Sequence, residues 1–342
     1  MLEKQQLEEI QNYIENGKKI AITTHTNPDG DAIGSSLAVY HYLKTKGANV
    51  KAVVPNKFPG FLKWLPNSNE LIIFEKDAKK AKKVLEEADL IFCLDYNALL
   101  RTGAVTNDLK ESKGKKVLID HHISPEVEDF DYVISDVNSS STGEIVYEFI
   151  AAMGDEDLIK KTISECLYTC IITDTGSFSH SCNNVKTYEI TAKLIANGVD
   201  ARKSHGLIYD TFSESRLRLL GFAINDRMLV WDDLKTALIY LTKDDLVKYK
   251  YKVGDTEGVV NFALSMDKVN MAVLVTEKDK KIRLSFRSKG SFSVNDLARK
   301  HFNGGGHRNA AGGNMAKPIM EVIDEIKSVV KNYKNQLNYE IK

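Results

Sequence analysis

The sequence lacks the features that mark membrane and secreted proteins. Its apolar runs all stay well below the about 18 residues that a membrane-spanning helix needs. The N-terminal stretch MLEKQQLEEIQNYIENG has the pattern of an amphipathic helix, whereas a secretory signal would be a basic segment followed by an apolar one. We therefore expect a globular protein of the cytoplasm that has no membrane partner.

An excess of one charge and paired cysteine motifs are also absent. The 47 basic and 47 acidic residues balance, so any contact with nucleic acid needs a local basic patch. The four cysteines form no CxxC pair and have mostly apolar neighbours, which favours buried thiols over a zinc site or disulfides. The 342 residues are enough for about two domains.

Strand-like and helical segments alternate in the first half of the chain. Strands are expected at residues 18–25, 49–55, 88–95 and 115–120, and helices at 31–47, around 79–87, at 141–154 and at 157–174. The runs at 88–95 and 115–120 are apolar nearly throughout, as in strands that are buried on both faces. The alternation predicts an α/β fold with a mostly parallel, Rossmann-like sheet.

The pattern changes after residue 185. Residues 186–226 are helical and polar, which suits a connector. Strand-like runs at 237–242, 271–277 and 281–288 follow, and then a helix from Ser293 and the cluster NGGGHRNAAGG. We therefore expect a first domain at 1–185, a helical connector at 186–226 and a smaller α+β domain at 227–335.

Acidic and histidine side chains gather where the predicted strands end. His25 ends the first strand, Asp95 ends the run LIFCLD, and DHH at 120–122 ends VLIDHH. Carboxyl ends of parallel strands meet at one edge of a sheet, where open α/β folds bind ligands. Asp174 would join them if the loop after its helix reaches that edge. The resulting set is His25, Asp29, Asp31, Asp95, His121 and Asp174.

The composition of this set indicates metal binding. Clustered carboxylates repel one another and raise their own pKa values, so such a set is stable only around a strongly positive group. Oxygen and imidazole donors without sulfur suit manganese or magnesium better than structural zinc. Six side chains suit two ions about 3.5 to 4 Å apart that share one carboxylate, as in phosphoryl displacement. The ligand set therefore predicts two divalent cations, manganese or magnesium.

Each motif also has a simpler interpretation when it is taken alone. HTNPDGDAIG is also typical of a strand-to-helix connection in which Asp31 caps the helix. Asp95 and the adjacent histidines of DHH are also common in turns. The combination is more specific than its parts, because four separate positions at the sheet edge must coincide.

Together the motifs resemble the DHH phosphoesterases that carry a DHH-associated C-terminal domain. The matching segments are HTNPDGDAIGSSLA from His25, LD at 94–95, DHH at 120–122, ITDTGSF at 172–178 and GGGHRNAAGG at 304–313. The resemblance spans nearly the whole chain. It implies a metal-binding DHH domain, a substrate-binding second domain and an active site in the cleft between them.

The resemblance also implies two Mn²⁺ ions, with Mg²⁺ or Co²⁺ as alternatives, and a role for each residue of the set. The ligands would be His25 and Asp29 for one ion, Asp31, His121 and Asp174 for the other, and Asp95 shared by both. Asp120 would orient a ligand histidine from outside the metal shell. His122 would face the substrate phosphate.

A local basic patch in the second domain suits phosphate binding. Residues 280–308 contain eight lysines and arginines against one acid, Asp296. Arg283 and Arg287 lie on the same side of a predicted strand, although a solvated sheet face is the alternative. The three glycines before His307 allow close backbone approach to a ligand, although such a run is often a flexible joint. The candidate substrate contacts are Arg101, Arg283, Arg287, Ser288, Gly305, Gly306, His307 and Asn309.

The resemblance is greatest to the stand-alone bacterial branch of the family, because the chain has no room for an added oligonucleotide-binding barrel. It implies a manganese-dependent phosphoesterase that hydrolyses short oligoribonucleotides and removes the 3′-phosphate from adenosine 3′,5′-bisphosphate (pAp) by two-metal activation of water. Long duplexes are not expected to bind. A phosphodiesterase for cyclic or linear dinucleotides, and a non-catalytic nucleotide- or RNA-binding module, are the alternatives. The sequence leaves open whether the chain forms a homodimer.

Overall fold

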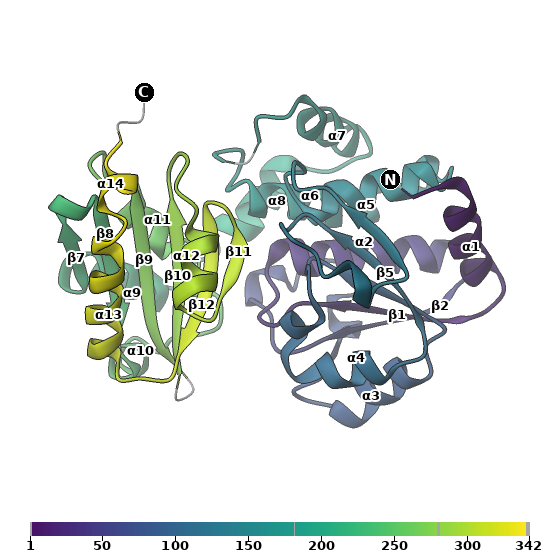
Figure 1. The fold of residues 1–342 in the computed structure, drawn as a ribbon. Helices are drawn as coiled ribbons and strands as arrows, with labels where there is room; N and C mark the ends of the chain where they lie inside the picture. The colour runs from purple at the N-terminus through teal and green to yellow at the C-terminus, as the bar shows by residue number, and fades with distance from the viewer. Residues whose placement is uncertain (1, 181, 279–280, 340–342) are drawn as a thin grey trace. The chain divides into compact units, whose positions relative to one another are not determined.

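The computed structural model describes residues 2–180, 182–278 and 281–339, which form two compact units, Met1–Thr211 and Phe212–Lys342 (Figure 1). Each unit contains one six-stranded sheet with helices on both faces. Within the described residues, no helix combines the length and the apolar character that a bilayer crossing requires.

The sheet of the first unit is parallel throughout. Its strands are β1 (Lys19–Thr24), β2 (Asn49–Val54), β3 (Ile72–Ile73), β4 (Leu90–Leu94), β5 (Lys115–Asp120) and β6 (Tyr132–Ser135). Their order is β3-β2-β1-β4-β5-β6, so the direction of winding reverses between β1 and β4. In such sheets ligands bind beyond the carboxyl ends of the strands at this reversal. The predicted α/β class of the first domain is confirmed.

Alternating side chains bury both faces of this sheet. Ile20, Phe92 and Ile119 face one hydrophobic core, and Ala21 and Cys93 face the other. Helices α2, α5 and α6 cover the first face and α3 and α4 the second (Figure 1). The helices of this unit are α1 (Lys4–Glu15), α2 (Gly30–Thr45), α3 (Ala78–Glu86), α4 (Thr106–Glu111), α5 (Thr142–Ala152), α6 (Lys161–Asp174), α7 (Val185–Ala196) and α8 (Ala201–Tyr209).

Glycines let α2 and α5 approach α6 closely. A Cβ atom on Gly34 would lie 2.5 Å from the Cys170 sulfur and 2.7 Å from the Cys166 carbonyl oxygen. A Cβ atom on Gly143 would lie 2.3 Å from that of Cys170. Helix α2 is therefore buried on nearly all sides, and its N-terminus is fixed against the C-terminal part of α6.

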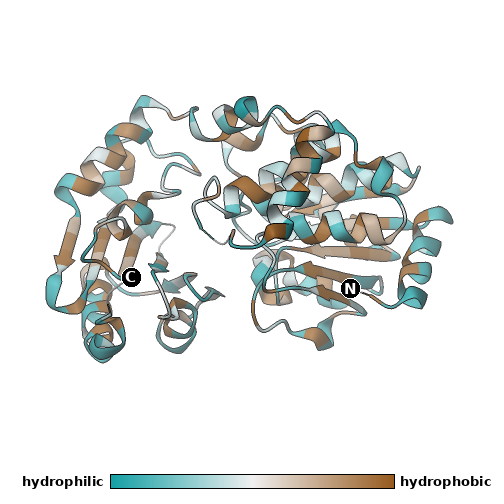
Figure 2. Cartoon of the chain, turned by 90° about the horizontal axis from the view of Figure 1, so that it is seen from above, coloured by the Kyte–Doolittle hydropathy of each residue, from teal (hydrophilic) through white to brown (hydrophobic). Residues whose placement is uncertain are grey.

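The second unit has a mixed sheet in the order β11-β12-β10-β9-β8-β7, in which β8 and β9 are parallel and the other pairs antiparallel. The strands are β7 (Met228–Trp231), β8 (Thr236–Leu241), β9 (Met271–Lys278), β10 (Lys281–Ser288), β11 (Gly305–His307) and β12 (Ala310–Met315). The helices are α9 (Glu214–Asp226), α10 (Lys243–Lys248), α11 (Val259–Leu264), α12 (Val294–His301), α13 (Ile319–Lys331) and α14 (Lys334–Leu337). Figure 2 colours the strands of both sheets mostly brown, which matches their buried positions. The predicted smaller α+β domain is confirmed.

The predicted connector at 186–226 is divided between the two units. Ile190 and Leu194 of α7 and Ile208 of α8 pack into the core of the first unit. Leu219 and Ala223 of α9 pack into a core of the second. The division follows these apolar stripes, because each stripe can be buried only against its own unit.

The close packing of α2 on α6 yields a testable prediction. We expect Gly34→Ala to destabilise the protein by about 1–3 kcal/mol, because the added methyl group overlaps the Cys166 carbonyl and the Cys170 thiol. Urea unfolding followed by circular dichroism measures this loss. Gly221→Ala is the matched control, since Gly221 lies within α9 with nothing near its missing Cβ atom, and alanine should stabilise that helix slightly. Equal midpoints for Gly34→Ala and the wild type would contradict the packing argument.

Candidate metal centre

The predicted ligands lie at the carboxyl edge of the first sheet, beside the reversal of strand order. His25 follows β1, Asp95 follows β4 and His121 follows β5. Asp174 is the last residue of α6. Asp95 has a φ of 64°, a left-handed conformation that aspartate tolerates better than most residues. The fold thus brings residues from distant parts of the chain to one edge.

The start of α2 differs from the simpler interpretation of HTNPDGDAIG. Asp29, and not Asp31, caps the helix: one Asp29 carboxylate oxygen accepts from the Asp31 and Ala32 amides, each at 3.1 Å. The first helical residue is Gly30, where a side chain would collide with Thr173 of α6. Asp31 is therefore in the first helical turn, fully buried.

The first group of donor atoms surrounds His25. Its Nε2 lies 3.3 Å from Asp95 Oδ2 and 3.8 Å from Asp29 Oδ2. Its Nδ1 lies 2.9 Å from the Thr26 carbonyl oxygen. A carbonyl only accepts hydrogen bonds, so Nδ1 carries a proton, and Nε2 is the ring nitrogen that faces the carboxylates.

The second group surrounds His121. Its Nε2 lies 3.2 Å from Asp174 Oδ2, 3.6 Å from Asp31 Oδ2 and 3.6 Å from Asp95 Oδ1. Its Nδ1 faces the Ser139 carbonyl oxygen at 3.2 Å, so this ring nitrogen also carries a proton. Asp95 thus turns one oxygen to each group, as a bridging carboxylate would.

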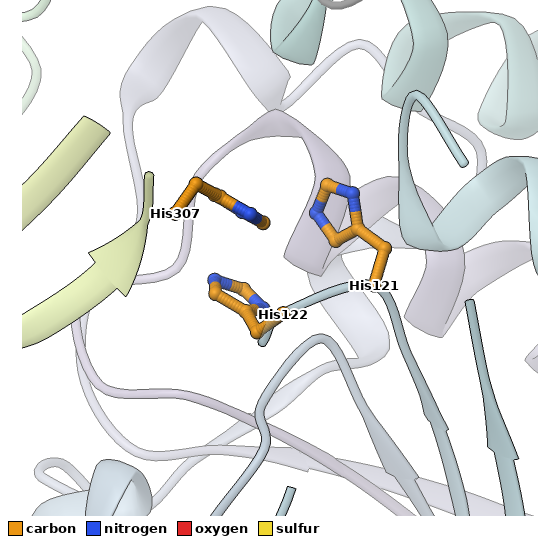
Figure 3. Close-up of side chains that lie close together, drawn as sticks. All are labelled: His121, His122 and His307. Atoms are coloured by element: carbon orange, nitrogen blue, oxygen red, sulfur yellow. The ribbon is translucent and has the colours of Figure 1, made fainter. Parts of the chain in front are cut away.

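Asp120 and His122 form a hydrogen-bonded pair beside Asp95, whose Oδ1 lies 3.7 Å from His122 Nδ1. His122 Nδ1 donates to Asp120 Oδ1 at 2.7 Å, and the His122 amide donates to Asp120 Oδ2 at 3.0 Å. The histidine that Asp120 orients is therefore His122, whereas the predicted ligand His121 is held by Ser139. The rings of the two histidines are nearly perpendicular, with centroids 5.1 Å apart (Figure 3).

Burial and mutual repulsion shift the pKa values of the cluster. Burial, followed by the charges of Asp31 and Asp29, raises the pKa of Asp95 well above its ordinary value. Burial and the Asp31 charge raise the pKa of Asp174 to about 6, although His121 opposes this. Burial lowers the pKa of His122, and the nearby Arg101 lowers it further. Burial also acts to lower the pKa of His121, but hydrogen bonding to Asp174 and the surrounding carboxylates outweigh it and raise the pKa.

These donors fit a divalent cation. His25, Asp29 and Asp95 each offer a ligand atom within 4.8 Å of the others, and so do Asp31, Asp95 and His121. The donors are oxygen and nitrogen atoms, which suit Mn²⁺ or Mg²⁺. A cation among the carboxylates would remove the repulsion that raises their pKa values. The two groups share Asp95, as the predicted allocation requires, and the identity of each ligand stays a prediction.

Sequence reasoning missed the contacts that the first residues of α5 make with the predicted ligands. The Thr142 and Gly143 amides donate to the two carboxylate oxygens of Asp31 at 2.6 and 3.0 Å. The Thr142 hydroxyl donates to Asp95 Oδ1 at 3.0 Å. The sequence indicated only a helix cap at Ser141 or Thr142, and Ser141 does cap α5. Four consecutive hydroxyl residues at 139–142 were the available signal.

The candidate substrate contacts in the second unit lie on and around β10, β11 and β12. Arg283 and Arg287 share the face of β10 opposite Phe286, which packs in the core. The Asn309 side-chain amide donates to the Ser288 hydroxyl at 2.8 Å, and the Gly306 amide donates to Asn295 Oδ1 at 2.8 Å.

The glycine cluster thus forms an ordered β11–β12 hairpin and not a flexible joint. Its Gly306 amide is not free for phosphate, contrary to the expectation for this cluster. His307, also labelled in Figure 3, belongs to β11. Lys280 of the basic patch lies outside the described residues.

Comparisons with known proteins agree with this architecture. The sequence model of the DHH family, N-terminal domain, matches residues 19–171, and that of the DHHA1 domain matches residues 236–336. A crystal structure of an exopolyphosphatase-related protein from Bacteroides fragilis is 40% identical, superimposes with a TM-score of 0.91 and covers 98% of both chains. The chain belongs to the DHH family. The predicted family is confirmed, and so is the prediction of an enzyme that hydrolyses phosphoric esters.

Two curated relatives of this DHH-family chain carry a specific name. Proteins named bifunctional oligoribonuclease and PAP phosphatase NrnA are 26% identical in Bacillus subtilis and 28% identical in Thermus thermophilus. Each alignment covers 86% of this chain, with 88% and 83% of the respective relative. The DHH match contains five of the six predicted ligands, and Asp174 follows its end by three residues.

The raised pKa of Asp174 yields a prediction for the metal-free protein. Folding raises this pKa from 3.8 to about 6, so the folded state holds the proton more tightly than the unfolded chain. The contribution of Asp174 to stability should therefore fall as the pH rises from about 4 to about 6. Asp174→Asn has no such group and should lose less stability over this range.

Thermal unfolding in a chelator at several pH values compares the two proteins. Addition of Mn²⁺ at pH 7 should stabilise the wild type more than Asp174→Asn, because the cation binds the charged carboxylate. Identical pH dependences of the wild type and Asp174→Asn would contradict this account.

Proposed function

We propose that this protein hydrolyses short oligoribonucleotides to mononucleotides and removes the 3′-phosphate from pAp, with two Mn²⁺ ions as cofactors. The observation that carries the proposal is the pair of donor groups that share Asp95. The names of the two relatives that match most of the chain support the choice of substrates. Mn²⁺ suits a mixed set of imidazole and carboxylate ligands, and Mg²⁺ or Co²⁺ would be substitutes.

The proposed ligands divide as the family motifs imply. His25 and Asp29 would hold one ion, Asp31, His121 and Asp174 the other, and Asp95 both. When bound, two such cations supply charge neutralisation at a phosphoryl group and the activation of water. The Thr26 and Ser139 carbonyls would orient the two ligand histidines through their Nδ1 protons.

His122 has a different proposed role. Asp120 fixes its Nδ1 proton, and its pKa is lowered, so at neutral pH Nε2 is an acceptor. We propose that Nε2 faces the substrate phosphate, whose negative charge would raise the imidazole pKa and let it take up a proton. Arg101 lies close enough to influence His122 electrostatically and is proposed as a phosphate contact. For the second unit we propose contacts through Arg283, Arg287, Ser288, Gly305, His307 and Asn309, and close backbone approach at Gly306, whose amide is bound to Asn295.

Turnover of an RNA dinucleotide tests the metal centre. We expect metal-stripped protein to release mononucleotide only after Mn²⁺ is added. Asp95→Asn should lower kcat/KM by about a thousandfold, because several kcal/mol of transition-state charge stabilisation would be lost. The matched control is Asp77→Asn, which alters an exposed carboxylate that caps α3.

Two results would contradict this assignment. Turnover that survives both the chelator and Asp95→Asn would show that another site performs it. Binding of the dinucleotide without turnover at any metal concentration would favour a non-catalytic nucleotide-binding module.

A substrate series tests the proposed specificity. We expect pAp and RNAs of two to a few nucleotides to give higher kcat/KM values than cyclic dinucleotides, measured side by side with Mn²⁺. The highest value for a cyclic dinucleotide would overturn the oligoribonuclease assignment and make the protein a cyclic dinucleotide phosphodiesterase.

A further inference from the structure

One short turn contacts three of the six proposed metal ligands. This turn, defined as residues 139–143 and including the first two residues of α5, donates two backbone amides to Asp31 and the Thr142 hydroxyl to Asp95. Its Ser139 carbonyl faces His121 Nδ1. The position of this turn therefore sets the direction of two carboxylates and one imidazole at once.

A buried carboxylate outside the ligand set holds this turn. Glu144 has no exposed surface, and its Oε2 accepts from the Ser140 amide at 3.1 Å and from the Ser140 hydroxyl at 2.6 Å. Its backbone amide donates to the Ser141 hydroxyl, which caps α5. A buried carboxylate is costly unless donors compensate it, so its presence here reflects these hydrogen bonds and not the apolar packing of the helix.

Helix α7 completes the support. The Thr187 hydroxyl donates to Glu144 Oε2 at 2.9 Å. Lys186 Nζ lies 3.9 Å from Glu144 Oε1 and 2.9 Å from Glu148 Oε1 on the next turn of α5. Glu144 thus connects the turn at 139–143 to α7, a helix of the predicted connector.

We propose that Glu144 is a positioning residue of the metal centre. It fixes the turn at 139–143 through Ser140, and this turn then orients Asp31, Asp95 and His121 towards the cations. The proposal rests on the proposed function, because it takes these three residues as metal ligands. Glu144 itself makes no contact with metal or substrate in this account.

Two substitutions separate this geometric role from a charge effect. Glu144→Ala removes the acceptor of three hydrogen bonds, so the turn loses its support. Glu144→Gln keeps an acceptor where Oε2 lies and places its NH₂ group towards Lys186. If Glu144 acts by positioning the turn, Glu144→Gln should keep most of the Mn²⁺ affinity that Glu144→Ala loses. If Glu144 acts only through its negative charge, both variants should lose the same affinity.

The experiment is a calorimetric titration of metal-stripped protein with Mn²⁺. We expect Glu144→Ala to weaken Mn²⁺ binding about 10- to 100-fold, the range for residues that orient metal ligands, and Glu144→Gln to stay near the wild-type affinity. Thr187→Val should weaken binding, and adding it to Glu144→Ala should cause little further loss, because both act through one network. Glu148→Gln is the matched control, since it contacts Lys186 but not the turn.

The outcomes distinguish this proposal from the proposed function. A wild type that binds no Mn²⁺ overturns the proposed function. A wild type that binds two ions, with an equally high affinity in Glu144→Ala, overturns only the role of Glu144. Equal losses in Glu144→Gln and Glu144→Ala also overturn it. If Glu144→Ala does not fold, Thr187→Val decides, and wild-type affinity in that variant would overturn the proposal.

Discussion

The mutual repulsion of Asp31, Asp95 and Asp174 is the constraint on which the first unit depends. Burial and proximity raise the pKa of all three carboxyl groups. The protein places donors against them: two amides on Asp31, a hydroxyl on Asp95 and an imidazole on Asp174. The pKa values stay raised in spite of these donors, so the hydrogen bonds alone do not balance the charge. A divalent cation would complete the balance, which makes charge compensation the physical link between fold and chemistry.

The packing of α2, α5 and α6 brings these carboxylates close to their hydrogen-bond donors. Asp31 lies at the start of α2, Thr142 at the start of α5 and Asp174 at the end of α6. Gly30, which packs on Thr173, and the other glycines at the α6 surface let these ends meet. Small side chains at these contacts are therefore required by the site as well as by the core, since a larger residue would separate the carboxylates from their donors.

The sequence allowed the strand ends to be predicted, because apolar runs such as LIFCLD are interrupted by Asp95 at the point where the sheet ends. It did not allow the order β3-β2-β1-β4-β5-β6 to be predicted, since strand order depends on pairing between segments far apart in the chain. The contact of Asp31 with Thr142 and Gly143 could not be predicted for the same reason, because 111 and 112 residues separate the partners. The close packing of Gly30 against Thr173 likewise joins segments that are far apart in the chain.

The glycine cluster of the second unit is required by the close pairing of β11 with β12. A Cβ atom on Gly304 would lie 1.9 Å from the Gly312 carbonyl oxygen, and one on Gly306 would lie 2.5 Å from that of Ala310. These glycines therefore let β11 pair closely with β12, and Asn295 already accepts from the Gly306 amide. Recognition of a phosphate at this hairpin would then depend more on side chains such as His307 than on free backbone amides. Because all six proposed ligands belong to the first unit, substitutions at this hairpin leave the proposed ligand set unchanged.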